Sequence, residues 1–248
     1  MTSNRRRVVI IPARMASTRL PGKPLADICG KPMIEWVYRK SASARGIDDV
    51  LVATPDAEIA EAVSAFGGRA VMTSSEHRSG TDRVAEVADD LDDEDIVVNV
   101  QGDEPMITPE SIESLIPPLE NIDAPHITSL MRAISLDEAA DPNLVKVVLD
   151  RVGNALYFSR SVIPYMRNSV PEIKIWGHVG IYGYTVRVLR EFSRLEPTPL
   201  ENAESLEQLR AIENGWRIRM IETSFKPIGV DTESDLEKVR NLFASKSP

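Results

Sequence analysis

Three basic side chains lie close together near the start of the chain, directly after a run of apolar residues. Arg14, Arg19 and Lys23 follow the apolar run 8–11, with a flexible Gly22 before the lysine. Guanidinium and ammonium groups neutralise polyphosphate oxygens, and ligands of open α/β sheets bind outside the carboxyl ends of the strands. A solvated basic loop on an acidic protein explains the same residues equally well by composition. The loop matches neither G-x-x-x-x-G-K-[ST] nor the dinucleotide-binding glycine pattern.

Two aspartates next to other expected elements could bind a metal ion. Asp103 follows the apolar stretch 96–100, and Asp231 precedes a C-terminal helix expected to be capped at Thr232. Mg²⁺ is usually held by one or two carboxylates together with substrate phosphates. On spacing alone, each aspartate could equally be a turn residue. The acidic run 89–95 contains a D-x-D motif, but it precedes its strand and therefore belongs to the opposite edge, where we expect a solvated turn.

The elements that must position these residues alternate regularly in the first half of the chain. Apolar runs predict strands at 8–11, 50–54, 70–72 and 96–100. Helices are expected at 32–44, with Pro32 at the first helical position, at 56–66 with Asp56 as its cap, and from the polar loop 73–83 through 91. After 126 the pattern changes to a short helix capped by Ser135, a hairpin at 145–149 and 155–159, and a strand at 178–185. One helix is expected over 200–210, with an apolar stripe facing the core.

These patterns predict an α/β protein with an open, mostly parallel sheet. We assign 1–125 and 200–248 to a nucleotide-binding α/β core, and 126–199 to a smaller lobe that extends the sheet and mediates self-association.

Composition narrows the class of protein further. The chain has 248 residues, a net charge of −9 and a pI near 5.0. An acidic surface argues against a nucleic-acid partner, because binding to the phosphate backbone needs a basic surface. The single cysteine, Cys29, cannot form an intrachain disulfide and fits a reducing compartment. No apolar stretch approaches the ~20 residues of a membrane span. We therefore expect a soluble, cytoplasmic protein without a membrane partner.

Several motifs resemble one enzyme family closely. They are Ile11-Pro12-Ala13-Arg14 through Lys23-Pro24-Leu25, then Gly30-Lys31-Pro32-Met33-Ile34, and the V-N-V-Q-G-D-E-P block at 98–105. Together they resemble the 3-deoxy-manno-octulosonate (Kdo) cytidylyltransferases, also called CMP-Kdo synthetases. The resemblance covers nearly the whole chain. It implies a Rossmann-like nucleotidyltransferase fold with a small dimerisation lobe, a homodimer, Mg²⁺ as cofactor, and CMP transfer from CTP to Kdo for lipopolysaccharide or capsule biosynthesis.

The resemblance also assigns residues to the nucleotide and the metal. It implies that Asp103 and Asp231 bind the metal, and that Arg14, Lys23 and Asp103 are catalytic. The residues implied to bind CTP are Arg14, Ser17, Arg19, Lys23, Ser79, Gly80, Thr81, Arg83 and Gln101.

The resemblance also assigns residues to the sugar acid. The resemblance implies contacts from Gln101, Arg160, His178, Tyr182, Glu207 and Gln208. Without it, His178 is a hydrogen-bonded strand-end histidine, Tyr182 is a core aromatic residue, and Glu207 and Gln208 lie on a solvated helix face. Several family members have a basic residue before the histidine, where this chain has Gly177. We therefore expect Arg160, helped by His178, to hold the acid's carboxylate.

Two kinds of alternative remain open. The same CMP transfer could use another acid, such as 8-amino-Kdo, a different ulosonic acid or a small phosphonate. A non-catalytic CTP-binding regulator is an alternative of another class, although a regulator should have lost the metal carboxylates, and Asp103 and Asp231 are present. A glycosyltransferase is disfavoured because the D-x-D motif lies at the wrong edge of the expected sheet.

Overall fold

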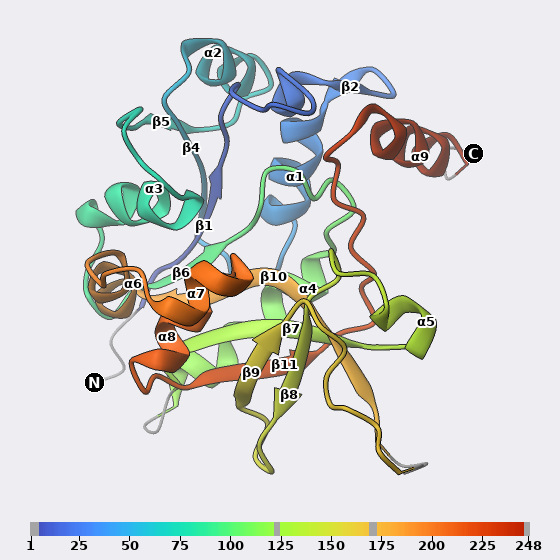
Figure 1. Cartoon of the computed structure of the whole chain (residues 1–248). Coiled ribbons are helices and arrows are strands. Elements are labelled where there is room, and N and C mark those ends of the chain that lie inside the picture. Colours follow the sequence, from blue (N-terminus) through green and yellow to red (C-terminus); the bar gives the residue numbers. More distant parts are fainter. Residues whose placement is uncertain (1–4, 122–124, 169–172, 246–248) are drawn as a thin grey trace.

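A computed structural model describes residues 5–121, 125–168 and 173–245. In these residues the chain forms a nine-stranded sheet whose main path runs β11-β7-β10-β6-β1-β4-β5, with β8 and β9 attached through β10 (Figure 1). Its strands are β1 (Arg7–Pro12), β4 (Asp49–Thr54), β5 (Ala70–Met72), β6 (Ile96–Asn99), β7 (Ile127–Ile134), β8 (Lys146–Leu149), β9 (Ala155–Ser159), β10 (Ile175–Thr185) and β11 (Ile218–Glu222). A separate small ribbon pairs β2 (Asp27–Ile28) with β3 (Lys31–Pro32).

The first strand is the centre of the parallel half of the sheet. β1 pairs in parallel with β4 on one side and with β6 on the other. Val8 and Ile10 pack into one hydrophobic cluster while Val9 and Ile11 pack into another, so β1 is buried on both faces. The parallel register brings the carboxyl ends of β1, β4 and β6 to one edge of the sheet. The expectation that the basic loop and Asp103 emerge there together is confirmed.

The other half of the sheet is mixed. β10 runs antiparallel between β6 and β7, and β11 is parallel to β7. The hairpin β8–β9 pairs with the start of β10, as expected for strands that extend the sheet. One sheet is thus shared by the strands of residues 1–125 and those of the lobe 126–199. The assigned boundary directly follows residues 122–124, which lie outside the described ones, and the roles given to this lobe stay predictions.

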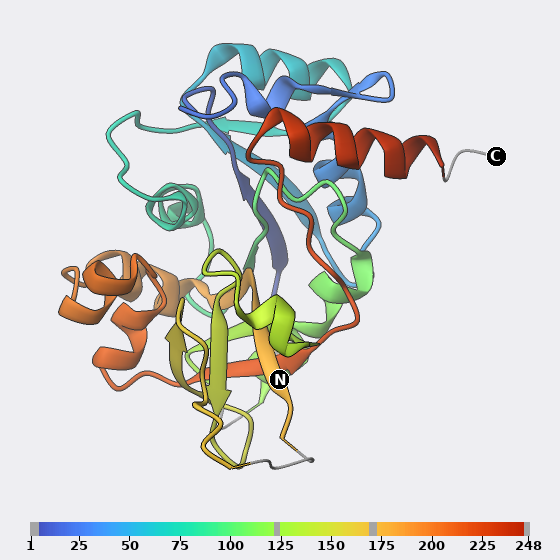
Figure 2. The ribbon, with the colours of Figure 1, turned by 45° about the vertical axis from the view of Figure 1, so that its right-hand side comes forward.

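Helices cover both faces of the sheet. Figure 2 shows α2 and α9 at one end of the molecule and the β8–β9 hairpin at the other. No helix among the described residues combines the length and the apolar character needed to cross a membrane. The helices are α1 (Met33–Ala42), α2 (Ala57–Ala65), α3 (Gly80–Val87), α4 (Pro109–Ser114), α5 (Leu136–Ala139), α6 (Val186–Ser193), α7 (Pro199–Glu204), α8 (Leu209–Glu213) and α9 (Glu233–Ala244), with 3-10 turns η1 (Lys23–Leu25), η2 (Ala88–Asp90) and η3 (Pro117–Glu120).

Two expectations about where helices begin and end are wrong. Pro32 precedes α1 as its N-cap in an extended conformation, because it pairs with Asp27 in the small ribbon. The single helix expected over 200–210 is two helices, α7 and α8, separated at Ser205, whose φ is 52°. The carboxylate of Glu204, at the break, accepts hydrogen bonds from Ser159 Oγ at 2.6 Å and from the Arg160 N–H at 2.9 Å. Tertiary contacts to β9 therefore accompany the end of α7, although the apolar spacing continues.

Candidate active site

A cleft of about 670 Å³ opens at the carboxyl edge of β1 and β6. Its wall combines the loop after β1, the N-terminal end of α3, the loop after β6 and the segment before α9. Most of the residues expected to bind the nucleotide and the metal line this one cleft: Arg14, Ser17, Arg19, Lys23, Ser79, Gly80, Arg83, Gln101, Asp103 and Asp231. The structure thus gathers side chains from four separate parts of the chain around one hollow.

Lys23 lies between the two aspartates predicted to bind the metal. Its Nζ atom is 2.6 Å from Asp103 Oδ2 and 3.1 Å from Asp231 Oδ1. Arg19 Nη2 lies 3.0 Å from the other oxygen of Asp231. Burial lowers the pKa of Lys23, but the attraction and hydrogen bonds of Asp103 and Asp231 outweigh this effect and raise the pKa above its ordinary value. The lysine is therefore positively charged at neutral pH.

The loops that carry the two aspartates are joined by their backbones. The Val230 N–H donates to the Asp103 carbonyl oxygen at 3.0 Å. Next to it, the carboxyl group of Glu104 accepts a hydrogen bond from the Ile228 backbone. Burial, with a smaller contribution from Asp103, raises the pKa of Glu104 to about 8. Glu104 was not singled out from the sequence, where it is only the neighbour of Asp103.

The predicted Mg²⁺ site can be compared with the side chains that would bind the ion, Asp103 and Asp231. Within the described residues, no set of three or more His, Cys, Asp or Glu side chains is arranged to hold a metal ion. Asp103 and Asp231 nevertheless converge on one cationic group, the ammonium of Lys23. Two carboxylates facing one positive charge, next to a cleft open to phosphates, suit Mg²⁺. The residues fit the cofactor, and its binding stays a prediction.

The polar loop 73–79 leads into α3, and the N-terminal end of α3 lines the cleft. Ser79 is the N-cap of α3 and forms a capping box with Asp82. A side chain on Gly80 would come within 3.3 Å of the Pro12 ring, so glycine permits the close approach of α3 to the end of β1. Arg83 is 3% exposed and donates to the Ser74 carbonyl oxygen at 3.0 Å. Burial, and next the nearby charge of Arg14, lower the pKa of Arg83, which places two cations close together here.

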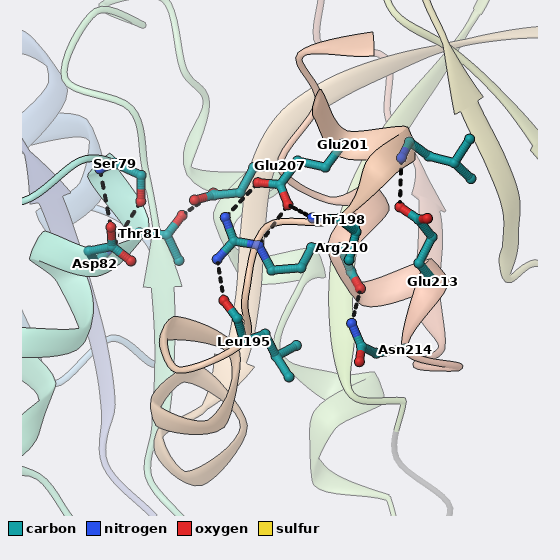
Figure 3. A network of polar contacts seen from close by, with 11 residues as sticks. Ser79, Thr81, Asp82, Leu195, Thr198, Glu201, Glu207, Arg210, Glu213 and Asn214 are labelled. Atoms are coloured by element: carbon teal, nitrogen blue, oxygen red, sulfur yellow. Dashed lines mark hydrogen bonds and ion pairs between the residues drawn. The ribbon is translucent and has the colours of Figure 1, made fainter. Parts of the chain in front are cut away.

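Thr81 and Glu207 join α3 to the connection between α7 and α8 (Figure 3). Glu207 was expected on a helix face, but it lies in the connection, and Thr81 Oγ1 donates to its carboxylate. Burial raises the pKa of Glu207. Gln208, the N-cap of α8, is 6% exposed. The alternative of a solvated helix face is therefore wrong for both residues, whereas their contact with a sugar acid stays a prediction.

His178 and Tyr182 lie next to each other on β10. Their ring centroids are 5.5 Å apart, and His178 Nε2 is 2.9 Å from Ser129 Oγ. Burial lowers the pKa of His178 to about 3. The histidine is therefore neutral at pH 7 and can help Arg160 only as a neutral hydrogen-bonding group.

Arg160 is held by backbone carbonyl groups. Its guanidinium donates to the carbonyl oxygens of Glu204 at 2.8 Å, Pro142 at 3.1 Å and Ser205 at 3.3 Å. The bonds to Glu204 and Ser205 tie the end of β9 to the break between α7 and α8, and the bond to Pro142 ties it to the segment before β8. Arg160 is thus a tertiary link in the described structure, and it does not line the cleft described above.

Gly177, where this chain departs from the expected family pattern, lies in a tightly packed part of β10. A side chain on Gly177 would meet Ile134 Cγ2 at 2.8 Å, so no larger residue fits without movement. Lys146 lies opposite Gly177 in the β8–β10 ladder. It is fully buried, and its ammonium donates to the carbonyl oxygens of Asp141 at 3.1 Å and of Arg160. The one sequence signal for Lys146 is a lone lysine within the apolar run 145–149.

This chain is similar to several known proteins. A family model described as cytidylyltransferase matches residues 8–221. A 3-deoxy-manno-octulosonate cytidylyltransferase of Geobacter metallireducens (strain ATCC 53774 / DSM 7210 / GS-15) is 54% identical over 93% of this chain and 94% of the relative. The Escherichia coli protein of the same name is 49% identical over 96% of each chain.

The comparison with solved structures leads to a similar protein. A CMP:2-keto-3-deoxy-manno-octonic acid synthetase complexed with CTP is 48% identical, with a TM-score of 0.92, over 98% of this chain and all of the other. A cytidylyltransferase from Leptospira borgpetersenii has a TM-score of 0.65 at 15% identity, a likeness of fold alone.

Proposed function

Because this chain belongs to the cytidylyltransferase family, we propose that it transfers CMP from CTP to the anomeric hydroxyl of 3-deoxy-manno-octulosonate and releases pyrophosphate. The observation that carries the proposal is the cleft in which Lys23 lies between Asp103 and Asp231, with Arg14, Arg19 and Arg83 on the same wall. This arrangement combines cations for a triphosphate with carboxylates for its metal ion. The similarity to 3-deoxy-manno-octulosonate cytidylyltransferases supports the choice of acceptor.

The transfer is a substitution at the α-phosphorus of CTP. The anomeric oxygen forms a bond to this phosphorus, the bond from the phosphorus to the bridging oxygen breaks, and the hydroxyl proton passes to solvent. Catalysis of this kind rests on positioning and charge stabilisation. We assign Arg14, Arg19 and Lys23 to the phosphate oxygens of the leaving pyrophosphate. Asp103 and Asp231 would hold Mg²⁺, which supplies further neutralisation of phosphate charge when bound.

The site of action and the assembly belong to the same proposal. We propose a cytoplasmic homodimer whose subunits meet through the lobe 126–199. Support for self-association comes from exposed apolar side chains in this lobe, among them Leu136 at 62%, Leu156 at 57% and Tyr165 at 87%. The oligomeric state can be measured by sedimentation velocity.

Pyrophosphate release tests the reaction and the acceptor together. Purified protein would be given CTP, Mg²⁺ and one acid at a time: Kdo, 8-amino-Kdo, sialic acid or phosphonoformate. We expect the fastest release with Kdo. Release only with another acid would refute the acceptor, and no release with any acid, despite CTP binding, would favour the non-catalytic regulator.

A further inference from the structure

Asp56 stands at the N-cap of α2 but does not cap it. An N-cap aspartate ordinarily accepts a hydrogen bond from an N–H in the first turn of its own helix. Here the side chain makes no such bond, contrary to the expectation from the sequence. Instead, Asp56 Oδ2 accepts the backbone N–H of Met15 at 2.7 Å. Its carboxylate therefore serves the basic loop after β1 instead of its own helix.

Met15 is the residue at which that loop closes. Its carbonyl oxygen accepts the N–H of Gly22 at 3.1 Å, so both backbone polar groups of Met15 are used. Gly22 has a φ of 70° and directly precedes η1, which begins with Lys23. A continuous path of hydrogen bonds and peptide links thus runs from Asp56 to the lysine between Asp103 and Asp231.

Asp56 also lies near the paired cations of the cleft. Arg14 disfavours the charged form of Arg83, whereas Asp56 favours it. The Asp56 side chain is only half-buried and does not line the cleft. It is therefore placed to support the cationic wall without occupying the space that phosphates would fill.

We propose that Asp56 is a positioning residue that holds the loop 14–23 in the shape that binds the triphosphate of CTP. The inference rests on the proposed function, because it takes CTP as the ligand. The acceptor sugar acid plays no part in it. Losing the Asp56 bond lets the loop open at Met15, and Arg19 and Lys23 then spend less time at the phosphate positions. CTP, which has the β- and γ-phosphates, loses more affinity than CMP, which lacks them.

The test compares three variants by calorimetry with CTP and with CMP in the absence of any acid. Asp56→Ala removes the acceptor, and Asp56→Asn keeps an acceptor oxygen but removes the charge. Asp48→Ala is the matched control, because Asp48 Oδ2 accepts the Arg7 N–H, also at 2.7 Å, at the opposite end of β1. Amide hydrogen exchange at Met15 is followed in the free proteins.

For Asp56→Ala we expect CTP binding about tenfold weaker, equivalent to 1.4 kcal/mol, CMP binding within about twofold of wild type, and faster exchange at Met15. Asp56→Asn should fall between wild type and Asp56→Ala, and Asp48→Ala should bind both nucleotides normally. Equal weakening of CTP and CMP, or unchanged CTP binding, would overturn the proposal. If Asp56→Ala does not fold, Asp56→Asn tests the proposal. A loss of CTP affinity in Asp56→Asn that is no greater than its loss of CMP affinity refutes the role of Asp56.

A failure of the Asp56 proposal can be distinguished from a failure of the proposed function. Wild-type protein that binds CTP but releases no pyrophosphate with Kdo would refute the reaction while leaving the calorimetric comparison valid. Wild-type protein that does not bind CTP would overturn both.

Discussion

The residues proposed to bind the nucleotide and those proposed to bind the acceptor use their polar groups differently. On the nucleotide side, which comprises Arg19, Lys23, Asp103 and Asp231, charged side chains pair with each other and stay partly exposed, with 64% of the Arg19 side chain and 48% of the Asp231 side chain accessible. The residues proposed to bind the acceptor, called the acceptor side, are Arg160, His178, Tyr182 and Glu207. Here His178 is 8% exposed, Tyr182 and Glu207 are half-buried, and the Arg160 guanidinium is bound to backbone carbonyls.

This difference predicts which substitutions change activity alone and which also change stability. Partly exposed ion pairs contribute little to stability, typically under about 1 kcal/mol, so Arg19 and Lys23 can exchange their carboxylate partners for phosphate oxygens at small cost. A buried carbonyl that loses its donor costs about 1–3 kcal/mol. Substitutions on the nucleotide side should therefore change activity with little loss of stability, whereas those on the acceptor side should change both.

The largest effect is expected for Asp103→Asn. Removal of one charge-stabilising group typically lowers kcat by about 10²-fold or more, and the partly exposed carboxylate adds little to folding. Steady-state kinetics in saturating Mg²⁺ and thermal unfolding measure the two quantities. Asp90→Asn, in the D-x-D run before β6, is the control and should keep wild-type kcat. Near wild-type turnover of Asp103→Asn would remove Asp103 from the catalytic residues.

A smaller effect, on both binding and stability, is expected for Arg160→Ala. The KM for the sugar acid should rise about tenfold, with an unchanged KM for CTP. The melting temperature should fall mainly because the carbonyl of Glu204, in a partly buried bond, loses its donor, whereas the bonds to Pro142 and Ser205 are exposed. Arg190→Ala is a matched control, since Arg190 also donates to three backbone carbonyls, those of Ala88, Asp89 and Leu91. If both variants lose stability and neither changes the acid KM, Arg160 is a structural residue only.

The smallest effect concerns His178 and pH. Its pKa is about 3 in the folded chain, below the ordinary 6.5, so the unfolded chain binds a proton that the folded chain does not between these values. The folded state therefore loses stability as pH falls below 6.5, by about 1 kcal/mol at pH 5.5 from this residue. The variant His178→Asn should not show this loss of stability at low pH.

Chemical unfolding at pH 5.5 and 7.5 measures the effect as a difference between wild type and His178→Asn. A stability difference that is the same at both pH values would show that burial does not keep this histidine neutral. The contrast between the two sides would then not hold for His178, the buried residue on the acceptor side.

Apolar spacing along the chain was enough to predict the parallel half of the fold and to place the basic loop and Asp103 at one edge of the sheet. A run such as Val8–Ile11 can only be buried on both faces, and parallel pairing then brings the loops after β1 and β6 to one edge. The basic loop and Asp103 therefore meet there, although Lys23 and its second partner, Asp231, are 208 positions apart.

The partners of Asp56, Arg160 and Glu207 could not be predicted from the local sequence. Local rules made Asp56 a helix cap and continued one helix through Glu207, because spacing and capping propensity describe only neighbours along the chain. In the folded chain the Asp56 carboxylate bonds a residue 41 positions away, and Arg160 bonds one 44 positions away. A carboxylate accepts from, and a guanidinium donates to, whichever group the packed elements bring within about 3 Å, and that proximity exists only once the sheet has formed.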